Sequence, residues 1–434
     1  MAAKYQVPRG TYDLLPDEAA VRRRILDEAR SLAEGAGFGQ IETPVFEESD
    51  LFVRTVGEAT DIVRKEMYTF TDRSGRSLTL RPEGTAPVCR AYIEHGMHKH
   101  PQPVKLWYAG PMFRYESPQA GRFRQHSQVG VETIGSDDPA IDAELIDLLG
   151  HLYARLGLGG VRLHLTSIGD AESRSEYARE LRSFLLKSDV FDADQRARIE
   201  LNPLRAFDWD EPEVRELTEA APKMLDRLSP ADREHFDEVR SLLDGAGIDY
   251  MLDPRLVRGL DYYTRTVFEF RADVLGAQSG IGGGGRYDRL IEQIGGEPTP
   301  AAGWASGLER IAQALTATGA DAGAETSAVP GGLHVLFAVT EPRARERVFR
   351  AVSELREEGL GATLDLGDRS LKSQMKHAAR LGVPWVVIVG PEEWSRDAAV
   401  VRDMNARDQE EVSLAQLRRE LSLRARAGRK DPRR

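Results

Sequence analysis

The chain has 434 residues, of which 41% are hydrophobic and 30% are charged, a composition that suits a soluble protein of two or three domains. The net charge of −11 argues against binding of nucleic acid over the whole surface. Residues 333–434, however, carry 20 Lys and Arg against 16 Asp and Glu, a net charge of +4, so the preceding residues carry −15. The sequence excludes a membrane span, a signal peptide and, with its one cysteine, an internal disulfide framework, and so favours a reducing cytoplasm.

A first helix is predicted to begin at Pro16, because the acidic residues that follow it suit the positive end of a helix dipole. Its apolar face is formed by residues at helical spacing, namely Val21, Ile25, Ala29 and Leu32. Gly35 and Gly37 end the helix. Residues 41–47 (IETPVFE) then form an extended segment, which Pro44 confines to a sheet edge or an interface.

Residues 77–96 are predicted to form a strand, a turn at Pro82 to Gly84 and a helix. Glu83 and Thr85 fall at the junction of strand and helix, where polar side chains either face a ligand or cap the helix. Cys89 lies in this helix. We interpret it as a packing residue, because no catalytic motif surrounds it.

Residues 106–135 are predicted to form two strands joined by a loop that carries Pro118 and Gly121. The alternation of side chains puts one set on a single face of the second strand, namely His126, Gln128, Gly130, Glu132 and Ile134. Because Gly130 has no side chain, we expect room for a small ligand between Gln128 and Glu132. Arg114 on the first strand has the fork that binds phosphate or carboxylate. An ordinary polar hairpin is the alternative.

A histidine-rich segment lies at the end of the helix predicted within residues 77–96. Its histidines lack the spacing of a structural zinc site and indicate a surface loop: His95, His98 and His100. After the paired strands, an amphipathic helix is predicted from Ile141, Leu145, Leu148, Leu149, Leu152 and Leu156. A strand at 161–169 comes next. Residues 171–248 are charged, contain interspersed prolines and show no chemical motif, so we interpret them as a helical insertion.

Reactive side chains return just before a β-rich run at 266–270, where Arg258, Asp261, Tyr262 and Tyr263 crowd around Gly259. A glycine run follows, in which Gly280, Gly282 and Gly285 have the spacing of a dinucleotide loop and are predicted to open a helix. A dinucleotide domain also requires repeated βαβ units, and none surrounds this run. We infer instead that the backbone here approaches another group closely or adopts positive φ.

Arg310 is predicted to lie in the first turn of a helix, where a cation opposes the dipole. It therefore has a specific anionic partner, unless it is a plain surface arginine. Residues 316–332 have the composition of a linker. Strands and helices then alternate, which predicts a compact α/β domain without a phosphate loop. The basic segment after Leu417 is typical either of a solvated, mobile end or of a segment attracted by phosphates.

Several ordered motifs resemble the histidyl-tRNA synthetase family of class II aminoacyl-tRNA synthetases along the whole chain. The most specific are LVRGLDYYTRTVFEF and GGGGRYDRL, and RGTYDLLP, TLRPEGTAP, FRYESPQAGRFRQHSQVGVETIG and GWASGLERI match in order. ETPVFE is similar to the class II dimer motif that contains Pro44.

The resemblance implies an α+β protein with an antiparallel catalytic sheet, a helical insertion and a C-terminal α/β domain that binds the anticodon. The expected boundaries are 1–170 and 251–318 for the catalytic domain, 171–250 for the insertion, 319–332 for the linker, 333–424 for the anticodon-binding domain and 425–434 for a basic tail. It further implies a cytoplasmic homodimer that activates L-histidine with ATP and Mg²⁺ and then esterifies the 3′ end of histidine tRNA.

The family also implies roles for the residues that match its motifs. Arg114 and Arg310 resemble the paired arginines that hold ATP, and Arg122 and Phe123 resemble the hairpin residues around it. Arg258 resembles the arginine that touches both the histidine carboxylate and the α-phosphate, so Arg258 and Arg114 are the expected catalytic residues. The histidine site comprises these two arginines together with Glu83, Thr85, Gln128, Glu132, Tyr262 and Tyr263. No resident protein-bound metal and no editing domain are expected.

The sequence departs from the family at four positions. His126 and Ser127 stand where an aromatic residue and then histidine are common, Ser117 where a basic residue is common, and Gly283 where alanine is common. The alternative function is that of a paralogue, the non-catalytic regulatory subunit of ATP phosphoribosyltransferase, but that paralogue lacks the C-terminal domain. A dinucleotide-dependent oxidoreductase, based on the glycine run, is a weaker third reading.

Overall fold

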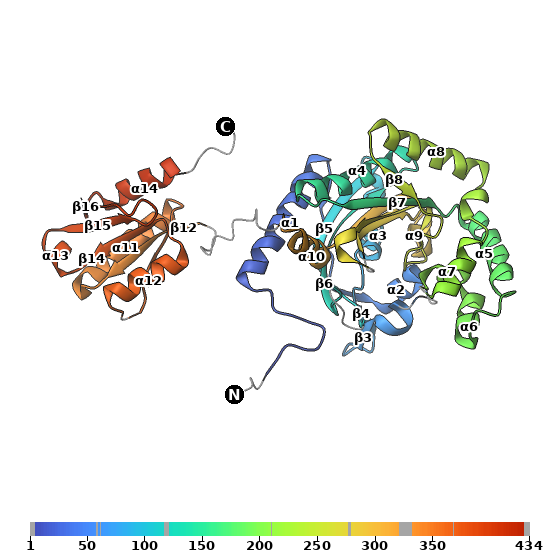
Figure 1. Cartoon of the computed structure of the whole chain (residues 1–434), viewed down its shortest axis with the longest axis horizontal. Coiled ribbons are helices and arrows are strands. Elements are labelled where there is room, and N and C mark those ends of the chain that lie inside the picture. Colours follow the sequence, from blue (N-terminus) through green and yellow to red (C-terminus); the bar gives the residue numbers. More distant parts are fainter. Residues whose placement is uncertain are drawn as a thin grey trace. The chain divides into compact units, whose positions relative to one another are not determined.

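The computed structural model describes residues 5–57, 60, 62–116, 121–209, 211–276, 279–320, 332–367 and 369–428. The chain forms two compact units, Met1–Ala324 and Glu325–Arg434, shown in Figure 1. Within the described ranges, no helix combines the length and the apolar character that a membrane span requires.

An eight-stranded sheet forms the centre of the first unit. Its strands, in spatial order, are β1 (Gly39–Gln40), β5 (Val104–Phe113), β6 (Gln125–Ile134), β11 (Ala301–Gly307), β10 (Gly280–Arg286), β9 (Thr264–Ala272), β7 (Val161–Ser167) and β8 (Tyr250–Leu252). The two outer pairs are parallel, and the pairs between them are antiparallel. The mostly antiparallel sheet and the predicted paired strands β5 and β6 are thereby confirmed.

Helices cover both faces of this sheet. On one face α1 (Pro16–Gly35), α4 (Pro139–Arg155) and α10 (Leu308–Thr318) enclose a core that includes Trp107, Val129 and Val131. On the other face α3 (Thr85–Glu94) and the short α9 (Leu290–Gln293) pack over Tyr108 and Ile134. Cys89 is fully buried in this second core, as predicted. The candidate residues of β6 therefore lie on the α3 face.

The glycine run corrects a prediction, because Gly280–Arg286 is a strand in the interior of the sheet and does not open a helix. The inferred close approach is confirmed: a Cβ on Gly284 would lie 1.9 Å from the carbonyl oxygen of Gly303 on the neighbouring strand. Glycine is needed here because the backbones of neighbouring strands leave no room for a side chain.

A three-stranded sheet, ordered β2 (Phe46–Glu48), β4 (Ser77–Leu80) and β3 (Tyr68–Thr71), lies beside α2 (Ser49–Val56) and a π-helical turn at Ile62–Glu66. Strand β2 is an edge strand that begins two residues after Pro44, in agreement with the prediction. The predicted histidine loop contains a 3₁₀ turn, Met97–Lys99.

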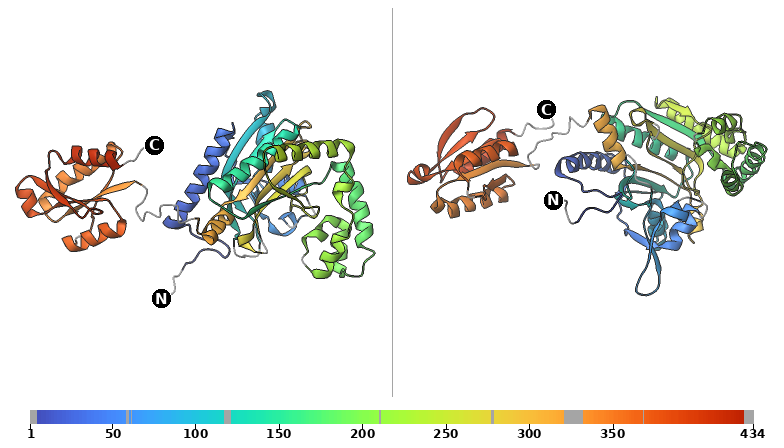
Figure 2. Two further views of the ribbon diagram at one scale, coloured as in Figure 1. Left: turned by 45° about the horizontal axis from the view of Figure 1, so that its top comes forward. Right: turned by 60° about the horizontal axis from the view of Figure 1, so that its bottom comes forward.

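The insertion is helical, as predicted. It consists of α5 (Ala171–Leu185), α6 (Ala193–Leu201), η3 (Pro203–Asp208), α7 (Pro212–Glu219), η4 (Met224–Asp226) and α8 (Pro230–Gly245). Helix α8 packs against α4, and both figures show the green insertion helices α5, α6 and α7 gathered at one side of the first unit (Figures 1 and 2). A turn at Asp273–Leu275 follows β9.

The second unit has a five-stranded sheet in the order β13 (Gly361–Leu364), β12 (Leu333–Val339), β14 (Trp385–Val389), β15 (Ala398–Asp403) and β16 (Gln409–Ser413). Its helices are η7 (Pro342–Ala344), α11 (Arg345–Glu357), α12 (Leu371–Leu381), α13 (Pro391–Ser395) and α14 (Leu417–Gly428). The predicted α/β alternation is confirmed through β14, whereas the antiparallel β15 and β16 were not predicted.

The basic C-terminal segment is only partly what its charge suggested. From Leu417 it forms helix α14, whose Leu417, Leu421 and Ala425 are buried in the core of the second unit. The prediction of a solvated end is therefore wrong for this helix, and the expected tail boundary at residue 425 falls inside it. Charge pattern alone hid the apolar spacing. Residues 429–434 lie outside the described residues, as do most of the expected linker and Ser117 and Pro118.

Candidate active site

Glu132 is the centre of a buried hydrogen-bond cluster on the α3 face of the sheet. Its carboxylate is fully enclosed and accepts hydrogen bonds from the hydroxyls of Thr85, at 2.8 Å, Tyr108, at 3.1 Å, and Tyr287. Burial raises the pKa of Glu132 to about 8, although the Tyr287 and Thr85 hydroxyls act in the opposite direction. This carboxyl is therefore protonated at neutral pH when only these hydroxyls surround it.

The space beside Gly130 is not open, which corrects the prediction of room for a ligand. Tyr108 pairs with Gly130 across β5 and β6, and a Cβ on Gly130 would lie 2.5 Å from the Tyr108 hydroxyl. The ring of Tyr108 thus lies over the glycine and reaches Glu132. Sequence analysis missed Tyr108 and Tyr287, because finding Tyr108 required the register of two strands.

Gln128 lies two residues before Gly130 on β6, and its side-chain oxygen remains available as a hydrogen-bond acceptor. Its side-chain oxygen is buried and accepts no hydrogen bond from any residue the structure describes. A buried polar atom without a partner is costly, so such an atom at a site indicates a missing donor. The predicted alignment of Gln128 with Glu132 on one strand face places this acceptor in line with the Glu132 cluster.

Glu83 fulfils the capping interpretation. Its carboxylate accepts hydrogen bonds from the backbone N–H groups of Thr85, at 2.6 Å, and Ala86, at 3.0 Å, at the beginning of α3. Burial raises the pKa of Glu83, against the effect of these two donors and of Arg114. Arg114 itself donates from Nε to the carbonyl of Pro82, at 2.9 Å. Capping therefore positions Glu83 and Arg114 at the same turn.

Tyr262 and Tyr263 are both buried. Their ring centroids are 4.8 Å apart, and Tyr262 also lies 5.6 Å from Tyr287 in an edge-to-face contact. Since Tyr287 binds Glu132, the tyrosine pair and the Glu132 cluster form one continuous site.

Arg258 is paired with a carboxylate. Its Nη1 lies 2.5 Å from Oε1 of Glu269 on β9, and Oε2 of Glu269 accepts a second hydrogen bond from Arg271, at 2.7 Å. Burial alone would lower the pKa of Arg258, but Glu269 and the two neighbouring tyrosines reverse this and leave it raised. Arg258 is a permanently charged group held in a fixed position. A Cβ on Gly283 would lie 3.2 Å from Nη1 of Arg258 and 2.4 Å from the Phe268 carbonyl oxygen. Glycine, at a position where the family commonly has alanine, therefore avoids both close contacts.

Arg122, Phe123 and Arg310 come together where the loop between β5 and β6 meets α10. A Cβ on Gly121 would lie 2.8 Å from Nη1 of Arg310, and burial together with the charge of Arg122 lowers the pKa of Arg310. Phe123 packs on Tyr12 at a centroid distance of 4.6 Å. Two neighbouring guanidinium groups suit the negative charge of a polyphosphate. The hydrogen bonds described for Arg310 reach the Gly280 carbonyl, at 3.3 Å, and Gln313, at 3.1 Å, so its anionic partner stays a prediction.

The two departures on β6 are enclosed to different degrees. Burial, with the nearby charge of Arg114, lowers the pKa of His126 to about 3, so its imidazole is neutral. Ser127 is buried, and its backbone N–H donates to the Glu309 carboxylate at 2.9 and 3.0 Å. Ser127 therefore supports the fold, and only His126 faces the same side as Gln128.

Within the described ranges, no three His, Cys, Asp or Glu side chains lie close enough together to hold a metal ion. One carboxylate does lie among the arginines: Glu116 is 3.8 Å from Arg114 and 3.6 Å from Arg122. Because Mg²⁺ commonly binds through one or two carboxylates and substrate phosphates, this arrangement fits an ion that arrives with a nucleotide.

Comparisons with known proteins agree with this arrangement. A family model described as histidyl-tRNA synthetase matches residues 10–311, and one described as an anticodon binding domain matches residues 334–423. A protein of Desulforamulus reducens named histidine–tRNA ligase is 48% identical, covering 94% of this chain and 97% of its own length. One of Corynebacterium jeikeium with the same name is also 48% identical, covering 94% and 91%.

Solved structures show the same similarity. The apo histidyl-tRNA synthetase of S. aureus has a TM-score of 0.80 at 35% identity and covers 96% of this chain and 99% of its own. A Bacillus halodurans structure described as an ATP phosphoribosyltransferase regulatory subunit/histidyl-tRNA synthetase has a TM-score of 0.64 at 21% identity, with 90% and 99% covered. At that identity it shares the fold alone.

Proposed function

The chain belongs to the histidyl-tRNA synthetase family, and from this premise we infer that it activates L-histidine with ATP and then transfers histidine to the 3′ end of histidine tRNA. It is an aminoacyl-tRNA ligase. The observation that carries the proposal for its site is the buried Glu132 carboxylate, which binds the hydroxyls of Thr85, Tyr108 and Tyr287 and is joined through Tyr287 to the tyrosine pair.

We propose that Gln128 and the Glu132 cluster contact the histidine imidazole from the α3 face of the sheet, although Tyr108 fills the space directly beside Gly130. Gln128 offers an unused acceptor, and all the described donors to Glu132 are hydroxyls, which can rotate to admit an imidazole N–H. Glu83, Thr85, Tyr262 and Tyr263 complete the pocket. A site that leaves such buried polar groups unpaired with the wrong amino acid discriminates by a factor of about 10⁴.

In the adenylation step, an oxygen of the histidine carboxylate attacks the α-phosphorus of ATP, and the bond to the bridging oxygen of pyrophosphate breaks. Two anions must approach in line, so the protein has to offset their repulsion. We propose that Arg258, fixed by Glu269, and Arg114 contact the reacting groups, while Arg122, Phe123 and Arg310 hold the nucleotide. Mg²⁺ would enter with ATP and neutralise phosphate charge, and Glu116, which lies beside Arg114 and Arg122, is the carboxylate that would hold it.

The regulatory-subunit alternative has less support. The relatives at 48% identity are named as ligases and match almost the whole chain, including the C-terminal unit, whereas the likeness to the Bacillus halodurans protein is one of fold. We propose that residues 333–424 bind the anticodon, with the helical insertion and catalytic boundaries as predicted from the sequence.

We further propose a cytoplasmic homodimer. The three-stranded sheet exposes Phe46, at 46%, and Phe70, at 43%, and their ring centroids are 6.2 Å apart. Adjacent exposed aromatic rings beside the segment that resembles the dimer motif favour a partner surface there. Sedimentation of the wild type and of Phe46→Ser tests this proposal, since a monomeric wild type would refute it.

The decisive experiment on function is histidine-dependent exchange of pyrophosphate into ATP by the purified chain, with the other amino acids as controls. We expect exchange with histidine alone. Binding of histidine without exchange would instead favour the regulatory-subunit function, and the absence of both would refute the site.

A further inference from the structure

Resting on the proposed function, we propose that the helical insertion acts as a brace for the loop 258–265, and that Arg174 of helix α5 is a positioning residue for histidine activation. Nothing in the sequence motifs gave the insertion a role. Its contacts converge on the short segment that carries Arg258, Tyr262 and Tyr263.

The first contact set joins α5 and η3 to the loop. Nη1 of Arg174 donates to the carbonyl oxygens of Asp261, at 2.9 Å, and Tyr263, at 3.1 Å. The Asp261 carboxylate accepts a hydrogen bond from the Asn202 amide, at 3.4 Å, and lies 3.8 Å from Arg205. One guanidinium therefore fixes the backbone on both sides of Tyr262.

The second contact set holds a strained residue two positions after the tyrosine pair. Arg265 has a φ of 48°, in the left-handed region, and the register of β9 against β10 shifts at this point. Its Nε donates at 2.9 Å to the buried carboxylate of Asp232 on α8, which also accepts the backbone N–H of Asp170, at 2.9 Å. Such a bulge re-aims neighbouring side chains and persists only where other contacts enforce it.

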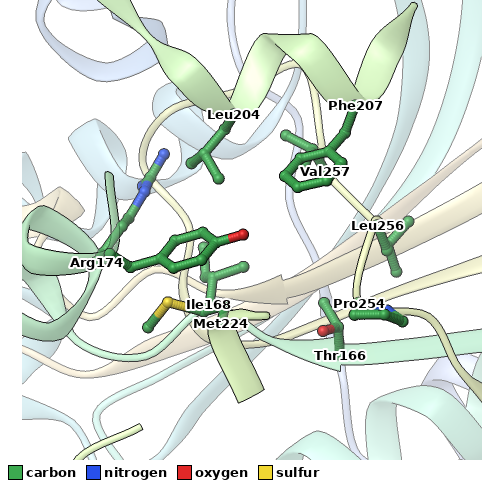
Figure 3. Close-up of a pocket in the computed structure, with 10 residues that line it drawn as sticks. Thr166, Ile168, Arg174, Leu204, Phe207, Met224, Pro254, Leu256 and Val257 are labelled. Carbon is green, nitrogen blue, oxygen red and sulfur yellow. The ribbon is translucent and has the colours of Figure 1, made fainter. Parts of the chain in front are cut away.

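Apolar packing supplies the third connection. A cavity of about 10 Å³, room for one water molecule, separates Leu204 and Phe207 of the insertion from Leu256 and Val257, which immediately precede Arg258. Figure 3 shows these four side chains around the same small space, with Arg174 at its side. Leu256 and Val257 thus face the insertion across this small space, directly before Arg258.

The contacts of the insertion point to the first half-reaction. Arg174 and Asp232 bind the backbone and a side chain of the loop that carries Tyr262 and Tyr263. Because we propose that these tyrosines contact histidine, we expect the insertion to affect histidine activation, which involves no tRNA.

The test compares Arg174→Ala, Arg174→Lys and the control Arg179→Ala, on the same helix, whose side chain is 72% exposed. The readout is histidine-dependent exchange, with separate KM values for histidine and ATP. Loss of a charge-assisted hydrogen bond corresponds to a factor of about 10 or more. We expect Arg174→Ala to raise the histidine KM at least about 10-fold and leave the ATP KM within about twofold, Lys to restore most of the loss and Arg179→Ala to match the wild type.

Hydrogen exchange separates bracing from general destabilisation. In Arg174→Ala we expect faster amide exchange in residues 259–265 and unchanged protection in β5 and β6. If Arg174→Ala does not fold, Asp261→Asn removes the charge that faces Arg205 and keeps the volume, and it should raise the histidine KM in the same direction. Unchanged histidine KM in a folded variant, or equal changes in both KM values, would overturn the brace. A wild type without exchange would refute the proposed function and not the contacts.

Discussion

Replacing Glu132 by glutamine should change how the stability of the first unit depends on pH. The carboxyl ionises near its ordinary pKa of 4.5 in the unfolded chain but only at about 8 in the folded one. Between these values unfolding releases a proton, so the free energy of unfolding of the wild type falls as the pH rises. Glutamine has the shape of the protonated carboxyl and no proton to lose.

The size of the effect follows from the two pKa values. Each pH unit inside the window contributes about 1.4 kcal/mol, so Glu132→Gln should gain on the wild type by roughly 5 kcal/mol in all between pH 4.5 and 8. The gain is smaller wherever hydroxyl rotation or water relieves the buried charge. Below pH 4.5 and above pH 8, the difference between the two proteins should be constant.

Urea unfolding at pH 5, 6, 7 and 8, followed by tryptophan fluorescence, measures this difference, because Trp107 and Trp304 are buried in the core of the first unit. Glu94→Gln is the matched control, since its side chain is 61% exposed. Parallel pH profiles for the wild type and Glu132→Gln would refute the assignment of a raised pKa to Glu132.

Three further predictions concern the site and the sheet that supports it. Arg258→Ala should slow histidine-dependent exchange by at least about 100-fold, because losing one preorganised charge costs about 3 kcal/mol in the transition state, and it should spare tRNA binding. Unchanged exchange would contradict the role of Arg258. Glu132→Ala should raise the histidine KM far more than the ATP KM, and equal effects would count against imidazole recognition. Gly303→Ala should destabilise the first unit by about 3 kcal/mol or more, because its Cβ would lie 1.8 Å from Oε2 of Glu132. Gly245→Ala is the control, since a Cβ at Gly245 has no neighbour within 4 Å. Equal melting temperatures of the two variants would contradict the packing at Gly303.

Local patterns in the sequence were sufficient for much of the fold. The buried face of α4 follows from leucine spacing, and the turn before α3 follows from Pro82 and Gly84. The same is true of the paired strands that carry Gln128 and Glu132. In each case the determining residues lie within one element, so periodicity and turn chemistry were enough.

What could not be predicted depends on register between distant segments. Tyr108 fills the space over Gly130 because β5 and β6 pair these two residues. Glu269 neutralises Arg258 because β9 runs back past the loop that carries the arginine. Neither relation leaves a periodic mark in the sequence. The sequence therefore predicted which kinds of chemical group form the site, but not whether each group already has a partner in the fold.

The place of the insertion in the chain makes its coupling to the site difficult to avoid. It leaves the sheet after β7 and returns at β8, and the backbone just outside both ends is hydrogen-bonded next to the tyrosine loop: Arg265 N–H donates to the Gly169 carbonyl, at 2.8 Å, and Asp253 N–H to that of Leu165, at 3.0 Å. A rotation of the insertion about these two ends must therefore displace either the bulge at Arg265 or the segment that leads to Arg258. Because the bulge is strained and its restraining carboxylate, Asp232, belongs to the insertion, the loop has little freedom of its own. A ligand of the insertion would act on histidine activation without reaching the active site only if its affinity differed between two positions of this loop.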